Sequence, residues 1–472
     1  MRRRDFFNYG VLTAVGGAIA SSSMIGCTSS QKASNKGKTR NIIFMVSDGM
    51  SAGTLIMSDL LLQRKEGRGS NWVGLLRENK ARRAWMDTAS ADCIVTDSAA
   101  GSSSWGGGFR VNNGSLNVAP DGTPHKPILQ KFKEAGKAVG CVTTVPVTHA
   151  TPAGFCVSRK SRNDQAAIAD LYLPLHFDVM MGGGTEYFSK DKRKDGKDLF
   201  ADFSAQGYSV VRNKTEMNSA GTEKPLLGVF HEGGLPYTID QKEDDQLKAE
   251  IPTLAEMTRK AIDHMEKNPN GFVLQVEGGK VDWAAHANDT GALLYDQIAF
   301  DEAAGVALAF AGQRDDTLVI ITTDHGNSNP GLIKSSNVND KFDLLQNFRY
   351  SNEWILQNIR NTDTPARVIE QINYAQGYAI TNDEAKEILL HYADLNNDGL
   401  YNDYKLPYRQ LAQIQQNYTS VGWSGMNHSA DFVELTMFGQ GSELLKPFVK
   451  NIELHNLMLE SAGVDALVAN QG

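Results

Sequence analysis

The chain has 472 residues, of which 41% are hydrophobic and 22% are charged. This composition excludes a mostly disordered chain and a membrane protein with many spans. The net charge of −8 argues against nucleic acid as the bulk partner, because binding a polyanion needs a field of Lys and Arg. The length would allow three average domains, but we favour one wide α/β domain with an insertion.

The N-terminal segment has the pattern of an export signal. Arginines at positions 2–4 precede a short apolar stretch from Val11 to Ala20, and residues 1–26 resemble a twin-arginine signal. The stretch is too short for a spanning helix, which needs about 20 apolar residues. Met-Ile-Gly-Cys at 24–27 resembles a bacterial lipobox, with cleavage elsewhere as the alternative. We therefore predict an exported protein of the periplasm or cell envelope, anchored to the membrane by lipidation of Cys27, with residues 27–38 as a flexible tether.

Three further cysteines follow: Cys93, Cys141 and Cys156. They allow one disulfide but no disulfide scaffold. Since none forms a tightly spaced pair, a thiolate zinc site is not expected. Any metal ligands should be carboxylates and imidazoles.

Apolar runs of strand length alternate with helical patterns along the chain. The expected strands are 41–47, 138–145, 272–276, 317–322 and 432–438, and the clearest expected helices are 127–135, 254–267 and 293–310. Continuous apolar runs are typical of strands buried on both faces. The sequence therefore predicts an α/β fold with a mainly parallel central sheet and helices on both faces.

Residues 329–424 interrupt this pattern with a polar, helix-rich stretch. We predict that 39–472 is one catalytic domain and that this stretch is an insertion, a cap or side lobe near the site entrance. Within it, 394–405 resembles an EF-hand loop, but Lys405 occupies the twelfth position, where calcium needs a bidentate Glu. A turn without calcium is the favoured interpretation.

Acidic and imidazole side chains stand where three of the expected strands end. Asp48 follows the first strand, Glu277 another, and Asp324 with His325 a third. Ligands of open α/β sheets bind outside the carboxyl ends of the strands, so these side chains should meet at one edge. Each Asp alone could instead cap a helix. Three such strand ends together favour a metal site.

The spacing of the remaining candidates divides the ligands into three sets. Asp282 and His286 are four apart, so one helical turn presents both to the same ion, and His428 would complete a catalytic zinc site. A second ion would take Asp48, Asp324, His325 and the Ser98 oxygen. Asp48, Thr151 and Glu277 form an all-oxygen set that suits magnesium.

One serine and one arginine suggest chemistry on a phosphoryl group. Ser98, in Thr-Asp-Ser-Ala-Ala-Gly at 96–101, is a candidate nucleophile that a bound metal could activate, although it could also be a helix cap. Arg162 could clamp two phosphoryl oxygens with its planar fork, with Asp97 holding it in place. A surface arginine is the alternative, and Arg159 is the neighbour that must be excluded.

These residues lie in motifs that resemble the alkaline phosphatase family over about 40–325 and 420–445. The motifs are Ile-Phe-Met-Val-Ser-Asp-Gly-Met at 43–50, Thr-Asp-Ser-Ala-Ala-Gly at 96–101, Thr-His-Ala-Thr-Pro-Ala at 148–153, Val-Glu-Gly-Gly-Lys-Val-Asp-Trp-Ala-Ala-His at 276–286, Thr-Thr-Asp-His-Gly at 322–326 and His-Ser-Ala-Asp-Phe-Val-Glu at 428–434. The resemblance implies a phosphomonoesterase, commonly a homodimer, that converts small phosphate monoesters through a phosphoserine on Ser98 at alkaline pH. It also implies two zinc ions and one magnesium ion per site, held by the sets given above, and a phosphate clamp at Arg162.

Two positions depart from the best-known bacterial pattern, which has Asp and Lys where this chain has His149 and Trp283. Other relatives share the His and Trp. An imidazole in place of a carboxylate suits zinc better and magnesium less well. We therefore expect the third site to bind magnesium weakly or to admit other ions.

Three other functions are alternatives. A phosphodiesterase of the same superfamily is the nearest enzyme alternative, although such enzymes generally lack the set with Thr151 and Glu277. A sulfatase is disfavoured because its Cys-X-Pro-X-Arg motif is absent. An inactive metal-binding surface lipoprotein would need neither Ser98 nor Arg162.

Overall fold

The computed structural model describes residues 38–392 and 405–464. The predicted signal and Cys27 lie outside the described residues, as does nearly all of the EF-hand-like stretch. Within the described ranges no helix is long and apolar enough to cross a membrane.

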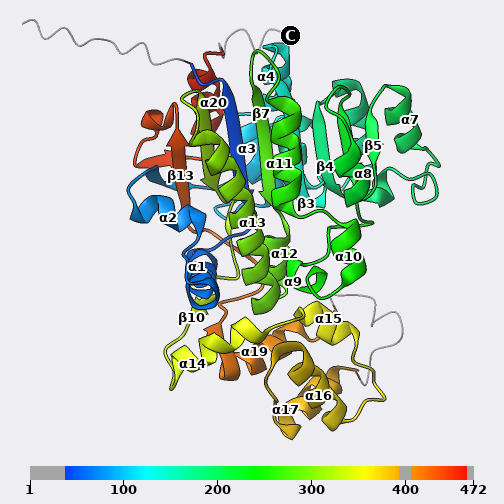
Figure 1. The fold of residues 1–472 in the computed structure, drawn as a ribbon, viewed down its shortest axis with the longest axis vertical. Helices are drawn as coiled ribbons and strands as arrows, with labels where there is room; N and C mark the ends of the chain where they lie inside the picture. Colours follow the sequence, from blue (N-terminus) through cyan, green and yellow to red (C-terminus); the bar gives the residue numbers. More distant parts are fainter. Residues whose placement is uncertain (1–37, 393–404, 465–472) are drawn as a thin grey trace, which may run out of the picture. The chain divides into compact units, whose positions relative to one another are not determined.

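A ten-stranded sheet forms the centre of the fold (Figure 1). In sheet order its strands are β14 (Phe448–Lys450), β2 (Arg82–Asp87), β13 (Val433–Gly439), β8 (Thr317–Thr322), β1 (Asn41–Ser47), β7 (Phe272–Gly278), β3 (Ala138–Pro146), β4 (Val179–Gly183), β6 (Leu226–Val229) and β5 (Ser209–Val211). Among these described strands only β13 runs antiparallel to its neighbours. The predicted mainly parallel α/β fold is confirmed.

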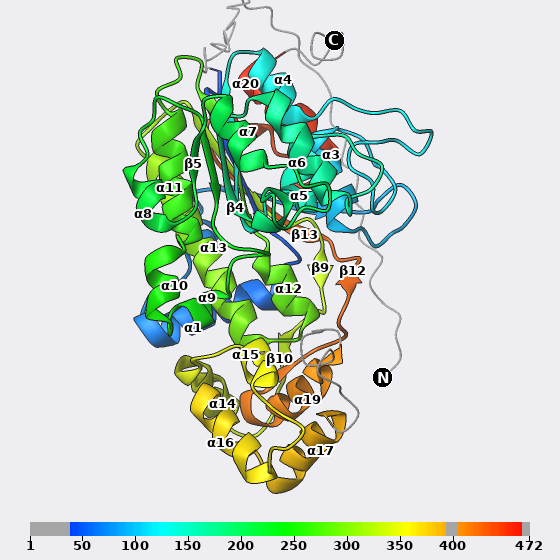
Figure 2. The same cartoon turned by 90° about the vertical axis from the view of Figure 1, so that its right-hand side faces the viewer.

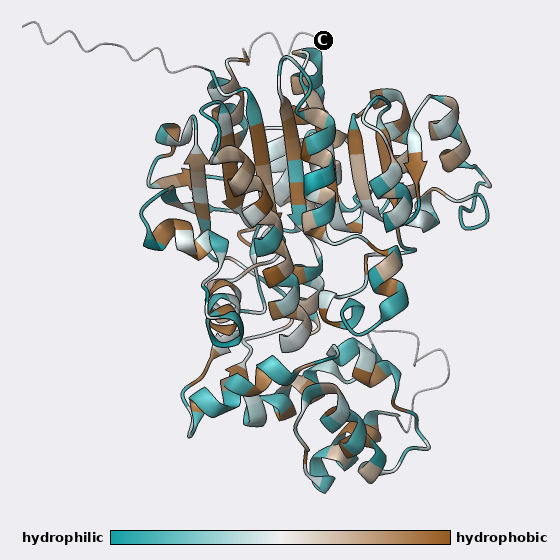
Figure 3. Cartoon of the chain, in the orientation of Figure 1, coloured by the Kyte–Doolittle hydropathy of each residue, from teal (hydrophilic) through white to brown (hydrophobic). Residues whose placement is uncertain are grey.

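Helices cover both faces because successive side chains of the central strands point to opposite sides. In β1, Ile43 and Met45 enter one apolar cluster, and Ile42, Phe44 and Val46 enter the other. One face carries α1 (Ala52–Glu66), α2 (Asn71–Arg77), α8 (Lys214–Ser219), α9 (Thr238–Gln241), α10 (Asp245–Glu250), α11 (Leu254–Met265), α12 (Lys280–His286) and α13 (Thr290–Ala311). The other carries α3 (Ser98–Gly106), α4 (Ile128–Glu134), α5 (Ala150–Cys156), α6 (Gln165–Tyr172), α7 (Leu199–Ala205) and α20 (Glu453–Ala462) (Figure 2). Hydrophobic residues concentrate on the central strands (Figure 3).

Residues 333–420, called here the helical segment, leave and rejoin the sheet domain at one place. Two short antiparallel ladders join the outgoing and returning chain, β9 (Gly326–Asn327) with β12 (His428–Ser429) and β10 (Gly331–Leu332) with β11 (Val421–Gly422). The described helices of the segment are α14 (Val338–Asp343), α15 (Asn352–Gln357), α16 (Pro365–Gln376), α17 (Asn382–Tyr392) and α19 (Tyr408–Thr419). In Figure 1 they lie beyond the carboxyl ends of the strands.

Buried amides hold three helices of this segment together. Asn352 on α15 bonds to Gln415 on α19, and Gln376 on α16 donates to Asn352 at 3.0 Å. The backbone N–H of Asn352 donates to Asp289, which also caps α13 through the N–H of Ala292. The segment is therefore fixed to the helix that follows the ligand-bearing α12.

We expect Asp289 to make stability depend on pH. Burial raises the pKa of Asp289 to about 7. A carboxyl whose pKa is raised in the folded state contributes stability at low pH and loses it as pH rises from about 4 to 7. Relative to Asp289→Asn, the native chain should therefore lose a few kcal/mol of unfolding free energy over that interval, at about 1.4 kcal/mol per pKa unit. Urea unfolding of both proteins between pH 4 and 8 measures this, and parallel profiles would contradict it.

Candidate metal centre

The predicted strand-end residues lie side by side at the carboxyl edge of the sheet. Val46, one residue before the end of β1, is paired with Glu277 on β7 and with Thr322 on β8. Asp48 directly follows β1, and Asp324 with His325 follow β8. Asp48, Glu277, Asp324 and His325 are all 0% exposed. Their burial means that the charges here can be compensated only by partners within the site.

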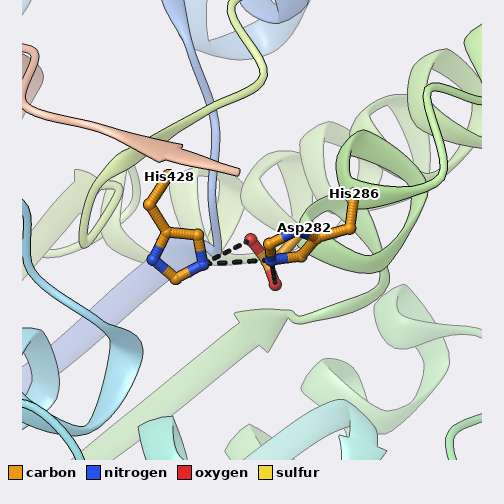
Figure 4. Close-up of side chains that lie close together, drawn as sticks. All are labelled: Asp282, His286 and His428. Atoms are coloured by element: carbon orange, nitrogen blue, oxygen red, sulfur yellow. Dashed lines mark hydrogen bonds and ion pairs between the residues drawn. The ribbon is translucent and has the colours of Figure 1, made fainter. Parts of the chain in front are cut away.

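Asp282, His286 and His428 form the first cluster (Figure 4). The Nε2 atoms of His286 and His428 are 3.0 Å apart, and Asp282 oxygens lie 3.4 Å from the first and 3.6 Å from the second. Helix α12 places Asp282 and His286 one turn apart, while β12 brings in His428 from a distant part of the chain. Two nitrogens and a carboxylate facing one point are a donor set that suits zinc.

Hydrogen bonds fix which nitrogen of each imidazole faces the cluster. His286 Nδ1 lies 2.8 Å from the carbonyl oxygen of Met426, and His428 Nδ1 lies 2.9 Å from that of Thr96. A carbonyl can only accept, so Nδ1 carries the proton in both rings and Nε2 presents its lone pair. This orientation by a backbone acceptor is typical of histidines that bind metal.

The second cluster combines His325 with Asp48 and Asp282. His325 Nε2 lies 3.6 Å from Asp48 Oδ1 and 3.2 Å from Asp324 Oδ2. The predicted set had Asp324 rather than Asp282, and both carboxylates reach this region. The backbone N–H groups of Gly49 and His325 donate to Asp324 Oδ1, each at 3.1 Å. Those bonds leave the other oxygen, Oδ2, facing His325.

The third cluster contains Asp48, Glu277 and His149. Thr151, predicted as its third oxygen donor, places its hydroxyl 3.2 Å from Asp48 Oδ2. Thr143 donates to Glu277 Oε2 at 2.5 Å. This site is therefore a mixed set in which one imidazole stands beside two carboxylates and a hydroxyl.

Buried carboxylate oxygens without hydrogen-bond partners indicate that the site binds cations. Asp48 Oδ1, Glu277 Oε1 and Asp324 Oδ2 are buried and have no hydrogen-bond partner in the described part of the chain. Leaving a buried charged acceptor unpaired is costly, and an ion bound among these atoms would remove that cost. The residues present fit metal ions.

Burial and neighbouring charges shift the pKa values of the site residues in both directions. Burial raises the pKa of Glu277 to about 7, and burial with the nearby Asp324 raises the pKa of Asp48 well above its usual value. Burial lowers the pKa of His428 to about 4, which keeps this imidazole neutral and able to bind metal. Although burial opposes ionisation of Asp282, His286 and His325 lower its pKa.

Ser98 lies at the first position of α3, beside these clusters. Its Oγ is 3.3 Å from His325 Nε2, and it lines a cavity of about 860 Å³. The helix cap is the preceding Asp97, which accepts from the N–H of Ala100. The alternative that Ser98 is the helix cap is therefore wrong. The positive end of α3 is favourable for negative charge on its oxygen.

Arg162 lines the same cavity and is held from two sides. Its Nη1 donates to Asp97 Oδ2 at 3.0 Å, and Nη2 lies 3.0 Å from His149 Nε2. Arg159, the alternative to Arg162, is half-buried and pairs with Asp164, and it does not line the cavity. Burial and Arg162 together lower the pKa of His149 to about 3. Trp283 meets the His149 ring edge-on, with centroids 6.1 Å apart.

Two contacts that orient ligands were not predicted. Asn327 donates to Asp282 Oδ1 at 2.7 Å, and Thr143 holds Glu277 as described above. Asn327 stands two residues after His325, so its position beside that motif was the available signal. Thr143 lies within an apolar strand and gives no such signal. Cys141 and Cys156 are free thiols with Sγ atoms 3.6 Å apart, and Cys93 is free and exposed.

A mostly parallel sheet with three clusters of metal-ligating side chains at its carboxyl edge defines the class as an α/β enzyme that uses metal ions. The alkaline phosphatase family model matches residues 39–464. The chain is 28% identical over 439 residues to alkaline phosphatase 4 of Bacillus subtilis, covering 91% of this chain and 90% of that protein. The crystal structure of Thermus thermophilus alkaline phosphatase superposes with a TM-score of 0.83 at 33% identity, covering 94% of this chain and 96% of that one. A cold-active alkaline phosphatase from Shewanella sp. superposes with a TM-score of 0.76 at 27% identity, covering 90% and 100%.

The chain belongs to the alkaline phosphatase family. The resemblance drawn from its motifs is thereby confirmed, and the protein is a phosphatase with metal cofactors.

Proposed function

We propose that the protein is a phosphomonoesterase that converts small phosphate monoesters to an alcohol and inorganic phosphate through a phosphoserine on Ser98. In the first step the Ser98 oxygen attacks phosphorus, the bond to the ester oxygen breaks, and the alcohol leaves with a proton. In the second step water attacks the phosphoserine, releases phosphate and restores the hydroxyl. Each displacement inverts phosphorus, so the overall reaction retains its configuration.

The position of Ser98 is the observation that carries this proposal. Its hydroxyl lies at the start of α3, 1% exposed, and faces the cavity beside His325. A bound substrate could reach it, while bulk water has little access. Arg162, positioned by Asp97, supports the choice of phosphoryl chemistry because its planar fork matches two phosphate oxygens.

We assign the metal ions by the donors of each cluster. Asp282, His286 and His428 would hold one zinc, and Asp48, Asp324 and His325 would hold a second, with Asp282 as a neighbouring carboxylate. Asp48, Thr151 and Glu277 would hold magnesium. Bound there, such cations supply positive charge that offsets the buried carboxylates and stabilises charge that develops on the phosphoryl oxygens.

The third site is proposed to be poorly selective for magnesium. His149 stands where an oxygen ligand would suit that ion, and its Nε2 is engaged by Arg162. His149 therefore links Arg162, the proposed phosphate clamp, to the third cluster.

Three further features belong to this proposal. The pattern of residues 1–26 supports export to the periplasm or cell envelope, and Cys27 supports a lipid anchor. Family membership supports a homodimer.

The relative turnover of a phosphate monoester and a phosphate diester tests the proposed substrate class. A second ester group removes one of the charged oxygens available to Arg162, so a simple aryl phosphate should be converted at least about a hundredfold more efficiently than the corresponding diaryl phosphate. Values of kcat/KM for both, measured with metal content per chain, decide this. Faster conversion of the diester would assign the phosphodiesterase function instead, and no turnover of either by metal-loaded protein would favour the inactive binding protein.

A further inference from the structure

The cavity that contains Ser98 extends well beyond the space that a phosphoryl group needs. Its volume of about 860 Å³ falls in the range of pockets that enclose a whole small-molecule ligand. Part of its lining comes from the sheet domain and part from the helical segment. The segment supplies Glu353 on α15, His391 on α17, and residues 406–410 at the start of α19. Three helices of one segment therefore form the wall that faces the nucleophile.

Aromatic side chains line this cavity between the two parts. Tyr237 and Trp283 come from the sheet domain, and Tyr408 comes from the helical segment. Lys280 makes cation–π contacts with the first two, with its Nζ 3.6 Å from the Tyr237 ring centre and 4.6 Å from that of Trp283. Tyr237 and Tyr408 are only 3% and 6% exposed, so their rings are held in place by packing. Flat, fixed aromatic surfaces favour a ligand with a planar ring.

Arg409 gives the wall a positive charge. The residue lies in the first turn of α19, is exposed, and lines the same cavity as Ser98. Across residues 38–392 and 405–464 no hydrogen bond or ion pair engages its guanidinium. Glu353, the acidic residue of the wall, already has an interaction of its own. Arg409 therefore differs from Arg162, which Asp97 and His149 hold at the reaction centre.

A buried hydrogen-bond network joins α15 and α19, two helices of the wall, to the sheet domain. Asn352, Gln376 and Gln415 join α15, α16 and α19 through a buried network, and Asp289 ties Asn352 to α13. The helix that carries Arg409 is thus anchored to the domain that carries Ser98. Rigid placement reduces the entropy that binding must overcome.

We infer that this wall is a leaving-group subsite and that Arg409 makes the enzyme prefer phosphate monoesters whose alcohol part carries a planar ring and a second anionic group. The inference rests on the proposed phosphomonoesterase function and narrows it to a substrate class. The ring would lie against Trp283, Tyr237 and Tyr408 while the phosphoryl group meets Ser98. The remote anion would meet the guanidinium of Arg409, which acts as a specificity-determining residue without contact to the reacting atoms.

A matched pair of esters tests the inference. The probes are 4-(carboxymethyl)phenyl phosphate and its methyl ester, which share one aryl leaving group and differ in the remote charge. With native, metal-loaded enzyme we expect a kcat/KM about tenfold higher for the carboxylate, because charge-assisted hydrogen bonds are about twice as strong as neutral ones. Arg409→Ala should remove this preference, mainly through KM, and leave the methyl ester within about twofold. Arg409→Lys should retain part of it, since lysine keeps the charge but not the planar fork.

Lys405→Ala is the matched control. Lys405 is exposed, lies four residues before Arg409, does not line the cavity, and its loss changes the net charge equally. In this variant, the ratio of kcat/KM for the carboxylate to kcat/KM for the methyl ester should equal that of the native enzyme. A native enzyme that converts both esters equally, or an Arg409→Ala variant that keeps the native ratio, would overturn the inference while leaving the proposed function intact. If Lys405→Ala lowered the ratio as much as Arg409→Ala, the preference would come from long-range electrostatic attraction and not from a contact with Arg409, which would also overturn the inference. If metal-loaded native enzyme converts neither ester, the proposed function itself fails.

Discussion

Ser98→Ala should abolish phosphate monoester turnover while leaving the metal content unchanged. The substitution removes only the hydroxyl that would attack phosphorus, and loss of a nucleophile that acts with the rest of a catalytic site costs roughly three to six orders of magnitude in kcat. The clusters of Asp, Glu and His ligands remain in the variant. Turnover of a simple aryl phosphate and zinc and magnesium per chain, measured on the same preparation, check both parts of this expectation.

Ser104→Ala is the control within the same helix. Its hydroxyl is equally buried but bonds back to the carbonyl oxygen of Ala100, so its loss should change kcat by less than about tenfold. A Ser98→Ala variant with near-native turnover would remove the phosphoserine from the mechanism. A chiral phosphate ester converted with inversion at phosphorus would do the same without any mutation.

Removal of the bound metal should lower both activity and stability. Asp48, Glu277 and Asp324 are buried and each has an oxygen without a hydrogen-bond partner in the described part of the chain. Burial raises the pKa of Asp48 and Glu277, so these two carboxyl groups tend to take up protons in the metal-free protein. Each tightly bound ion contributes about 4 kcal/mol to the unfolding free energy at a thousandfold excess over its Kd. We expect chelation to abolish turnover and to lower the Tm by several degrees, and zinc with magnesium to restore both. An unchanged Tm in protein shown to be metal-free would contradict a structural contribution from the clusters.

The His149→Asp substitution tests the third cluster without changing the ligands of the other two. A carboxylate at this position gives the oxygen-rich set that magnesium prefers. The variant should therefore be activated by lower magnesium concentrations than the native enzyme. The same substitution at the exposed His176 serves as control and should leave the magnesium dependence unchanged. Equal activation of the His149→Asp and native enzymes would show that the imidazole does not limit magnesium binding.

The central part of the fold could be predicted because its strands are buried on both faces. The expected strands 41–47 and 317–322 coincide with β1 and β8, since a continuous apolar run has clear ends. Strand β2 was not predicted, because its sequence Arg-Arg-Ala-Trp-Met-Asp has only three consecutive apolar residues between charged ones and shows neither a long apolar run nor a regular alternation. Strands β4, β5 and β6 are only three to five residues long and give little periodic signal. Their places in the sheet depend on partners far away in the sequence.

The reacting end of the site could be predicted more completely than its substrate-facing wall. Metal-ligating residue types are rare enough at strand ends that Asp48, Glu277 and Asp324 suggested a common edge. The cavity wall carries no such spacing. Arg409 is one charged residue among many, and only the packing of α15, α17 and α19 against the sheet domain places it opposite Ser98. Helix packing in three dimensions, rather than local pattern, decides which side chains line that wall.

The paired ladders β9–β12 and β10–β11 confine the connection between the helical segment and the sheet domain to one junction. Outgoing and returning chain run side by side there, so the helical segment leaves and rejoins the sheet domain without interrupting the central sheet. His428 lies on the sheet-domain side of that junction, while Arg409 lies on the far side. A change of sequence within the segment can therefore alter the side chains that face the alcohol part of a substrate, while the metal ligands keep their places on the sheet domain.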